Sequence, residues 1–165
     1  MKHPPLDIII HSDCLTGLRE LPSESVQCCV TSPPYWRLRD YGVKGQYGQE
    51  QTLEAYIENL VAVFEEVKRV LKPEGTFWLN MGDCYWGSGK QTRTNHSKNQ
   101  YPYGPPTTGR HRDIKAKDLI GLPWMVAFAL RKNGWWLRQE IIWHKKNCMP
   151  ESVKDRCTRA HETIF

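Results

Sequence analysis

The chain has 165 residues, of which 39% are hydrophobic and 25% are charged, and its formal net charge is +5. This composition is ordinary for a globular protein, and the length suffices for one domain with its own core. No run of 18 apolar residues occurs, and the first residues lack the apolar segment of a signal peptide. The sequence therefore predicts no transmembrane helix and a cytoplasmic location.

The first part of the chain predicts a strand, a helix and a second strand. The apolar run at 7–10 is typical of a short buried strand. A short helix is expected around 15–21, with Asp13 or Ser12 as its N-cap. Residues 26–30 form the second apolar run, which ends at two consecutive prolines.

The clearest helix begins after Thr52, a typical N-cap residue. Apolar side chains recur at three- and four-residue spacing from Leu53 to Leu71, as on the buried face of an amphipathic helix. The stretch 72–75 contains a proline and a glycine and is expected to end this helix. Residues 76–81 then predict a buried strand.

A long polar stretch follows at 82–117. Its part 86–117 holds seven basic side chains against one acid, Asp113. A connection of this length is usually functional or disordered. Its charge would suit a phosphate backbone, and the alternative is a solvated loop.

The last part of the chain predicts a helix from Pro123 to Asn133 and a strand at 135–144. A basic loop at 145–160 and the start of another strand at 161–165 complete it. Alternating strands and helices predict an α/β fold with a mostly parallel sheet. Ligand sites in such sheets lie beyond the carboxyl ends of strands, so the turn after the second strand and the turn at 82–83 should open on one edge.

The cysteines form no metal-binding or disulfide pattern. None lies in a C-x-x-C pair and no histidine stands at zinc-finger spacing from them. We expect reduced thiols, no metal ion and no disulfide. The six are Cys14, Cys28, Cys29, Cys84, Cys148 and Cys157.

The motif after the second strand is Thr31-Ser32-Pro33-Pro34-Tyr35-Trp36. Its two prolines fix φ and remove two backbone donors. The carbonyl groups of Ser32 and Pro33 precede residues without N–H, so the turn is rich in hydrogen-bond acceptors. With an aromatic ring beside it, the turn suits a planar ligand. The alternative is a strand that stops at a surface proline loop.

Four blocks of the sequence, in order, resemble the DNA amino-methyltransferases, the family that methylates N4 of cytosine or N6 of adenine. They cover nearly the whole chain and imply a partial Rossmann-like methyltransferase sheet. The blocks are Thr31-Ser32-Pro33-Pro34-Tyr35-Trp36 with Arg39-Asp40-Tyr41-Gly42, then Val70 to Asn80 with Gly82-Asp83, then Gly134 to Arg138 with Ile142 to Lys145, and finally Asn147 to Glu151 with Arg156 and His161-Glu162.

The resemblance implies a chemical role for the proline turn. An exocyclic amino group is a poor nucleophile because its lone pair is delocalised into the ring. The Ser32 side chain and the Pro33 carbonyl, held by Pro34, would accept its hydrogens, and Tyr35 would stack on a base extruded from the duplex. The methyl group would come from S-adenosylmethionine by direct displacement, without a cysteine nucleophile. Serine at the first motif position resembles the N4-cytosine enzymes, and adenine N6 is the alternative.

The resemblance also implies binding residues outside the turn. Asp13 would touch the adenosine of the cofactor, or serve only as a helix cap. Double-stranded DNA would be the partner, and for each predicted contact the alternative is an exposed, solvated side chain. These predicted contacts are Arg37, Lys145, Lys146, Asn147 and Arg156.

The glycine-rich cofactor turn of this family, in an Asp-Pro-Phe-x-Gly-Ser-Gly context, does not occur in the sequence. Gly87-Ser88-Gly89 follows no such strand and opens no helix. In the permuted order of the family, with the catalytic motif first, the glycine-rich half comes later. We therefore expect residues 1–165 to be the catalytic-motif part of one domain, inactive alone and completed by a carboxyl-terminal half in cis or in trans. A non-catalytic DNA-binding subunit, or an enzyme acting on RNA or a small amine, are the other hypotheses.

Overall fold

The computed structural model describes residues 7–87, 111–148, 150 and 154–165. Most of the basic stretch 86–117, namely 88–110, lies outside this described part. The elements, in chain order, are α1 (Cys14–Glu20), β1 (Val26–Thr31), α2 (Leu53–Val70), β2 (Leu71–Met81), α3 (Leu122–Lys132), β3 (Ile141–His144) and β4 (His161–Ile164).

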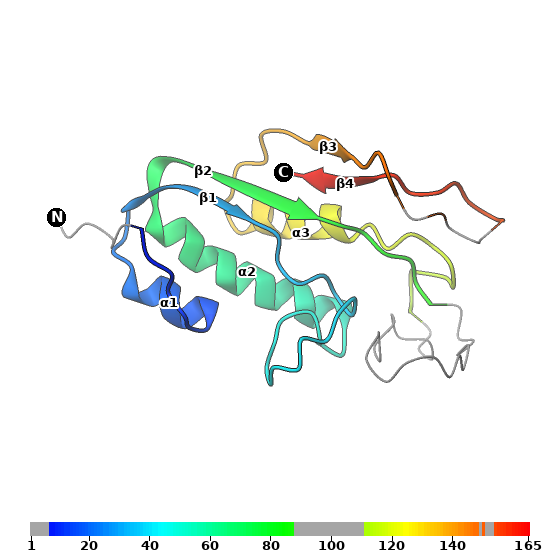
Figure 1. Cartoon of the computed structure of the whole chain (residues 1–165), viewed down its shortest axis with the longest axis horizontal. Helices are drawn as coiled ribbons and strands as arrows, with labels where there is room; N and C mark the ends of the chain where they lie inside the picture. The colour runs from blue at the N-terminus through cyan, green and yellow to red at the C-terminus, as the bar shows by residue number, and fades with distance from the viewer. Residues whose placement is uncertain (1–6, 88–110, 149, 151–153) are drawn as a thin grey trace.

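The four strands form one mixed sheet in the order β1-β2-β4-β3 (Figure 1). β1 and β2 are parallel, whereas β4 runs antiparallel to both β2 and β3. The α/β class is confirmed, but the sheet is mixed rather than mostly parallel. The reason is that residues 145–160 connect β3 to β4 without a crossover helix among the described residues, so β4 returns in the opposite direction.

The expected strand at 7–10 is wrong, because this segment is extended chain outside the sheet. Ile8 is 56% exposed and Ile9 is 95% exposed. Their apolar side chains predict burial, but no described strand pairs with this segment, although Ile10 lies near Val30 and Thr31 of β1. The strand expected at 135–144 is shorter, since only Ile141–His144 pairs with β4. β2 is longer than expected because it already begins at Leu71.

Helix α2 carries the core, as its periodicity predicts. It packs beneath the sheet with α3 beside it (Figure 1), and its stripe includes Tyr56 and Leu60, both at most 2% exposed. Thr52 is its N-cap, since the Thr52 hydroxyl accepts a hydrogen bond from the Ala55 N–H at 3.1 Å. The opposite face of the β1–β2 pair has no helix over it in the described part of the chain.

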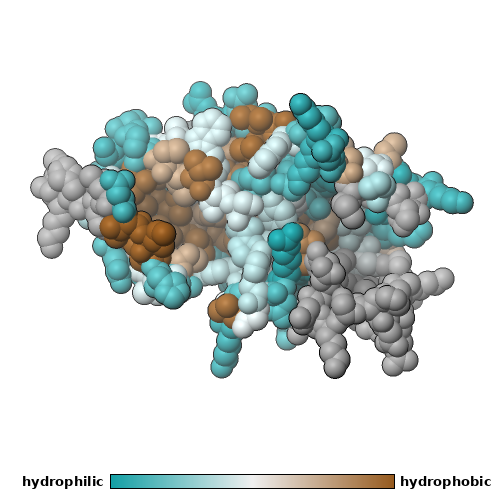
Figure 2. Space-filling view, viewed as in Figure 1, coloured by the Kyte–Doolittle hydropathy of each residue, from teal (hydrophilic) through white to brown (hydrophobic). Residues whose placement is uncertain are grey.

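That uncovered face is apolar. Val30, 76% exposed, lies opposite Trp78, 41% exposed, across the parallel pair. Figure 2 shows apolar residues gathered on this side of the molecule, at the end where β1 begins and along the strands above it. No helix of the described residues is long and apolar enough to cross a membrane.

Arg69 joins the end of α2 to the chain between α1 and β1. Its guanidinium donates to the carbonyls of Leu18 and Leu21 at 2.8 and 3.0 Å and to the Ser23 hydroxyl at 3.1 Å. Arg69→Met keeps the apolar stem but removes the guanidinium from these acceptors and from its ion pair with Glu66. We expect the free energy of unfolding to fall by about 1–3 kcal/mol. Urea denaturation of a chain that contains residues 1–165 measures this.

The matched control is Lys132→Met, at the exposed end of α3. It removes a charge of the same sign, and we expect a change within about 0.5 kcal/mol. Equal effects of the two substitutions would contradict the role of Arg69.

Candidate active site

The proline turn after β1 and the glycine turn after β2 meet at one edge of the sheet, as the sequence predicts. The Tyr35 ring lies directly on Gly82: a Cβ at that glycine would be 2.7 Å from Tyr35 Cε2. Only a residue without a side chain permits this approach. The two turns therefore form one continuous surface.

The turn is held from below by buried groups. The Tyr56 hydroxyl, on α2, donates to the Pro34 carbonyl at 2.9 Å. Trp36 is 2% exposed, and its indole N–H donates to the Glu50 carbonyl at 3.1 Å. Gly48, with φ +91°, packs against the carbonyls of Pro34 and Tyr35. The proline turn is thus a supported, half-buried structure rather than the surface loop that was the alternative interpretation.

The Tyr35 hydroxyl is the centre of a hydrogen-bond cluster. It donates to Glu162 Oε2 at 3.2 Å and accepts from Ser32 Oγ at 3.2 Å and from Asn80 Nδ2 at 3.1 Å. Asn80 Nδ2 also donates to Glu162 Oε2 at 2.9 Å, and Lys145 Nζ donates to Glu162 Oε1. The cluster therefore joins the proline turn to β2, to β4 and to the loop after β3.

Burial and charge shape the acidity of this cluster. Burial raises the pKa of Tyr35, and the neighbouring Glu162 carboxylate raises it further. Burial acts to raise the pKa of Glu162 as well, but hydrogen bonds from Lys145 and Asn80 outweigh it and leave that pKa lowered. The cluster is thus a neutral phenol held against an ionised carboxylate.

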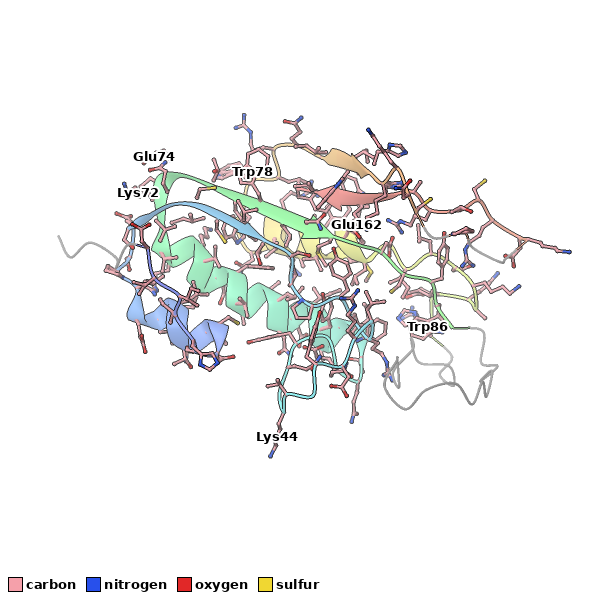
Figure 3. The ribbon with its side chains drawn as sticks, in the orientation of Figure 1. Lys44, Lys72, Glu74, Trp78, Trp86 and Glu162 are labelled. Atoms are coloured by element: carbon pink, nitrogen blue, oxygen red, sulfur yellow. The ribbon has the colours of Figure 1, made fainter. Side chains whose placement is uncertain are left out.

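Figure 3 shows the labelled Glu162 beside the carboxyl end of β2, with Lys72 and Glu74 at the opposite end of that strand. Asn80 and Glu162 are the two site residues that the motif analysis did not single out. Both lie in the blocks that carry the family resemblance. Asn80 lies two residues after Trp78, and Glu162 lies at the start of the last strand. Neither position predicts that the two side chains meet.

The acceptor-rich character of the turn is consistent with the bonding. Since the single Tyr35 hydrogen is donated to Glu162, Ser32 must donate its own hydrogen to Tyr35. This leaves both lone pairs of Ser32 Oγ available as acceptors. The carbonyl of Pro33 accepts no hydrogen bond within the described part of the chain.

Two aspartates near the site have structural roles in this structure. Asp13 Oδ1 accepts from the N–H groups of Leu15 and Thr16, so Asp13 is the N-cap of α1. Asp83 Oδ1 accepts from the N–H groups of Cys84 and Leu122, at the start of α3. Its other oxygen lies 3.4 Å from Arg159 Nη1.

The predicted DNA contacts occupy different environments. Lys146 and Asn147 are exposed in the loop after β3. Lys145 contacts Glu162 instead, and Arg156 lies over the Tyr85 ring with Cζ 3.6 Å from its centroid. Arg37 is half-buried, has φ +53°, and its backbone N–H donates to the Gly48 carbonyl at 2.6 Å.

Cys84 lies near this site, directly after Asp83. All six cysteines are free thiols. Burial raises the pKa of Cys84 to about 12, with the Asp83 charge as a smaller cause. Among residues 7–87, 111–148, 150 and 154–165, no group of three or more acidic, histidine or cysteine side chains could hold a metal ion.

A shallow depression adjoins the site where β1 ends. Its polar wall is Ser12, Asp13 and Thr31, and its apolar wall includes Ile10 and Val30. It therefore lies between α1, the middle of α2 and β1, and Ser32 follows its lining residue Thr31 in the chain.

The comparison with known proteins assigns the chain to a family. The family model N6_N4_Mtase, described as DNA methylase, matches residues 26–165. The chain belongs to this family of DNA methylases. It is 51% identical over 160 residues to the Type II methyltransferase M.SmaI of Serratia marcescens and 48% identical over 168 residues to M.Cfr9I of Citrobacter freundii.

Solved structures agree on the fold. The chain superposes on PvuII DNA methyltransferase (cytosine-N4-specific) with a TM-score of 0.62 at 21% identity, covering 93% of this chain and 45% of that one. It superposes on a putative DNA modification methylase from Thermus thermophilus, complexed with S-adenosyl-L-methionine, with a TM-score of 0.60 at 25% identity, covering 92% and 49%. The partial Rossmann-like methyltransferase fold is confirmed.

The chain spans about half the length of its relatives. The alignment with M.SmaI covers 95% of this chain and 54% of M.SmaI. The alignment with M.Cfr9I covers 99% of this chain and 56% of M.Cfr9I. The described structure is therefore compared with only part of each relative.

Gly82→Ala tests the contact between the two turns. The added methyl group would overlap the Tyr35 ring, so the ring must move and its hydroxyl must leave Asn80 and Glu162. We expect the free energy of unfolding to fall by about 1–3 kcal/mol, measured by urea denaturation. Gly17→Ala is the control, because it adds the same group in α1, 3.3 Å from the movable Ser12 hydroxyl. A Gly82→Ala protein as stable as the control would show that Tyr35 does not depend on this contact.

Proposed function

We propose that this protein is part of an enzyme that transfers a methyl group from S-adenosylmethionine to the exocyclic amino group of an extruded DNA base, cytosine N4. One observation carries the proposal: Ser32 Oγ donates its hydrogen to Tyr35 and so presents only lone pairs to a ligand. The Pro33 carbonyl, which accepts no hydrogen bond from the described residues, lies in the same turn. Two acceptors beside a flat ring suit an aromatic amine.

The physical effect of these acceptors would be on the amino group. Hydrogen bonds accepted by Ser32 and Pro33 would draw the amino nitrogen out of conjugation with the ring and expose its lone pair. The acceptors are held in place before the ligand arrives, by Tyr56 below and by Tyr35 beside them. Preorganised polar groups of this kind act without reorganisation during the reaction.

The choice of cytosine N4 rests on Ser32. The resemblance associates serine at this position with N4-cytosine enzymes and aspartate or asparagine with N6-adenine enzymes. A hydroxyl is a neutral acceptor, so it adds no charge to the pocket. Adenine N6 remains the other outcome of the test below.

The proposed DNA partner is supported by charge near the site. Lys146 and Asn147 are exposed beyond β3, on the edge where the proline turn lies. Arg37 follows that turn directly. We propose these three as phosphate or base contacts, together with Arg156. Lys145 is also proposed, although in this structure it pairs with Glu162.

The described residues fit one side of the proposed cofactor. The depression beside Ser32 offers an apolar wall for an adenosine and the Asp13 carboxylate for its polar groups. Because Oδ1 caps α1, Asp13 would use its other oxygen. When bound, S-adenosylmethionine would supply a methyl group carried on a cationic sulfur. Ser32 and Tyr35, at the adjoining turn, would hold the receiving amine.

We further propose that a second half of the enzyme covers the apolar face and the open edge of β1. Val30 and Trp78 are exposed there, and β1 pairs only with β2 among the described strands. An open apolar edge favours association with further chain. The relatives are about twice as long as this chain, so they contain enough residues for such a half. Below, the completed enzyme means residues 1–165 joined to the part of M.SmaI that this chain does not match.

The completed enzyme should methylate cytosine. It is incubated with unmethylated duplex DNA and S-adenosylmethionine, and the digested nucleosides are separated by mass spectrometry, with M.SmaI as the positive control. We expect N4-methylcytosine, and a fall in kcat of roughly a hundredfold for Ser32→Ala. Ser25→Ala, which makes the same change at the other end of β1, should retain activity. N6-methyladenine would overturn the choice of base, and no methylated nucleoside would overturn the function.

Residues 1–165 alone should behave as an incomplete protein. We expect self-association in size-exclusion chromatography and no heat of S-adenosylmethionine binding in calorimetry, because the apolar face is exposed and half of the cofactor site is missing. Addition of the M.SmaI part in trans should restore a defined complex. A monomeric chain that binds the cofactor tightly by itself would contradict the proposal of a second half.

A further inference from the structure

Glu162 stands out because it faces the proposed pocket but would touch neither base nor cofactor. Its side chain is 17% exposed, and both carboxylate oxygens receive hydrogen bonds. Lys145 donates to one oxygen, whereas Tyr35 and Asn80 donate to the other. Keeping a charged carboxylate here is costly unless it is paired. An ordinary reading is an ion pair that ties β4 to the loop after β3.

The bonding pattern gives the carboxylate a second consequence. An ionised carboxylate can only accept hydrogen bonds, so the Tyr35 hydrogen must point to Glu162. The Tyr35 oxygen then has only lone pairs left, and these accept from Ser32 and Asn80. Ser32, Tyr35 and Glu162 thus form a row of hydrogen bonds, and the negative charge of Glu162 fixes which group donates in each of them.

The amide of Asn80 agrees with this direction. Its Nδ2 donates to both Tyr35 and Glu162. The reversed amide would place Oδ1 against the carboxylate, where two acceptors would repel each other. Asn80, on the neighbouring strand β2, therefore favours the same directions of hydrogen-bond donation as Glu162.

We propose that Glu162 is a positioning residue, which fixes the hydrogen bonds from Ser32 through Tyr35 so that Ser32 presents acceptors to the target amino group. This inference rests on the proposed function. The hydrogen bond to Glu162 also holds the Tyr35 ring in one plane against Gly82. In this plane the ring would stack on the base. A glutamine at 162 has nearly the same shape but can also donate, so the row would lose its single direction.

The test is a double-mutant cycle in the completed enzyme with Glu162→Gln and Tyr35→Phe. Tyr35→Phe keeps the ring but removes the hydroxyl through which Glu162 acts. We expect each single variant to lower kcat by roughly tenfold with less than about a twofold change in KM for DNA. We expect the double variant to be no worse than either single one, since both break the same row.

The control is Glu58→Gln, the same chemical change at an exposed position of α2. It should leave kcat unchanged. Thermal unfolding of every variant shows whether a loss of kcat follows a loss of folded protein. If Glu162→Gln fails to fold, Glu162→Asp takes its place in the cycle, because it withdraws the carboxylate from Tyr35 by one methylene group.

The outcomes separate the inference from the function on which it rests. Full activity of Glu162→Gln, or effects that multiply in the double variant, would overturn the positioning role while wild-type methylation stands. Lost kcat that tracks the folded fraction would also overturn it, because a merely structural ion pair predicts that result. Absence of methyl transfer by the wild-type completed enzyme would overturn both.

Discussion

The bond between the Tyr35 hydroxyl and Glu162 is the constraint on which the site depends. It joins residues 127 positions apart and brings the turn after β1 into contact with β4. Asn80 adds β2 to the same cluster, and Lys145 adds the loop after β3. A proline turn at the end of an edge strand thereby becomes a rigid wall. Burial and the Glu162 charge favour the neutral Tyr35 phenol, and hydrogen bonds from Lys145 and Asn80, with a smaller effect of Tyr35, favour the ionised Glu162 carboxylate.

The rest of the fold supports that wall from beneath. Tyr56 lies in the buried stripe of α2 and donates a hydrogen bond to the Pro34 carbonyl. Helix α2 therefore fixes the position of the turn relative to the sheet. Gly82 lets β2 end against the Tyr35 ring without steric conflict. The opposite face of the β1–β2 pair, with Val30 and Trp78 exposed, has no helix over it among the described residues. The turn proposed to receive the amine is therefore held in place by residues of this chain.

Local features were predictable from the sequence because they depend on short-range physics. The α2 stripe follows from periodicity, the caps at Thr52 and Asp13 from residue type, and the shared edge of the two turns from sheet topology. The role of Asn80 and Glu162 depends on the antiparallel placement of β4, which no local pattern encodes. The strand expected at 7–10 failed because strand formation needs a neighbour as well as apolar residues. The sequence pattern predicts Lys145 as a DNA contact or an exposed, solvated side chain, whereas the fold places the acid Glu162 beside it.

We propose that the turn after β1 receives the amino group of a base extruded from DNA. The most direct measurement is a crystal structure of the completed enzyme with a duplex that contains its target base. On this proposal, we expect a flipped cytosine whose amino nitrogen lies within about 3.2 Å of both Ser32 Oγ and the Pro33 carbonyl oxygen, with its ring against Tyr35. A base that binds elsewhere, or a Ser32 hydroxyl that donates to the base instead of Tyr35, would contradict it.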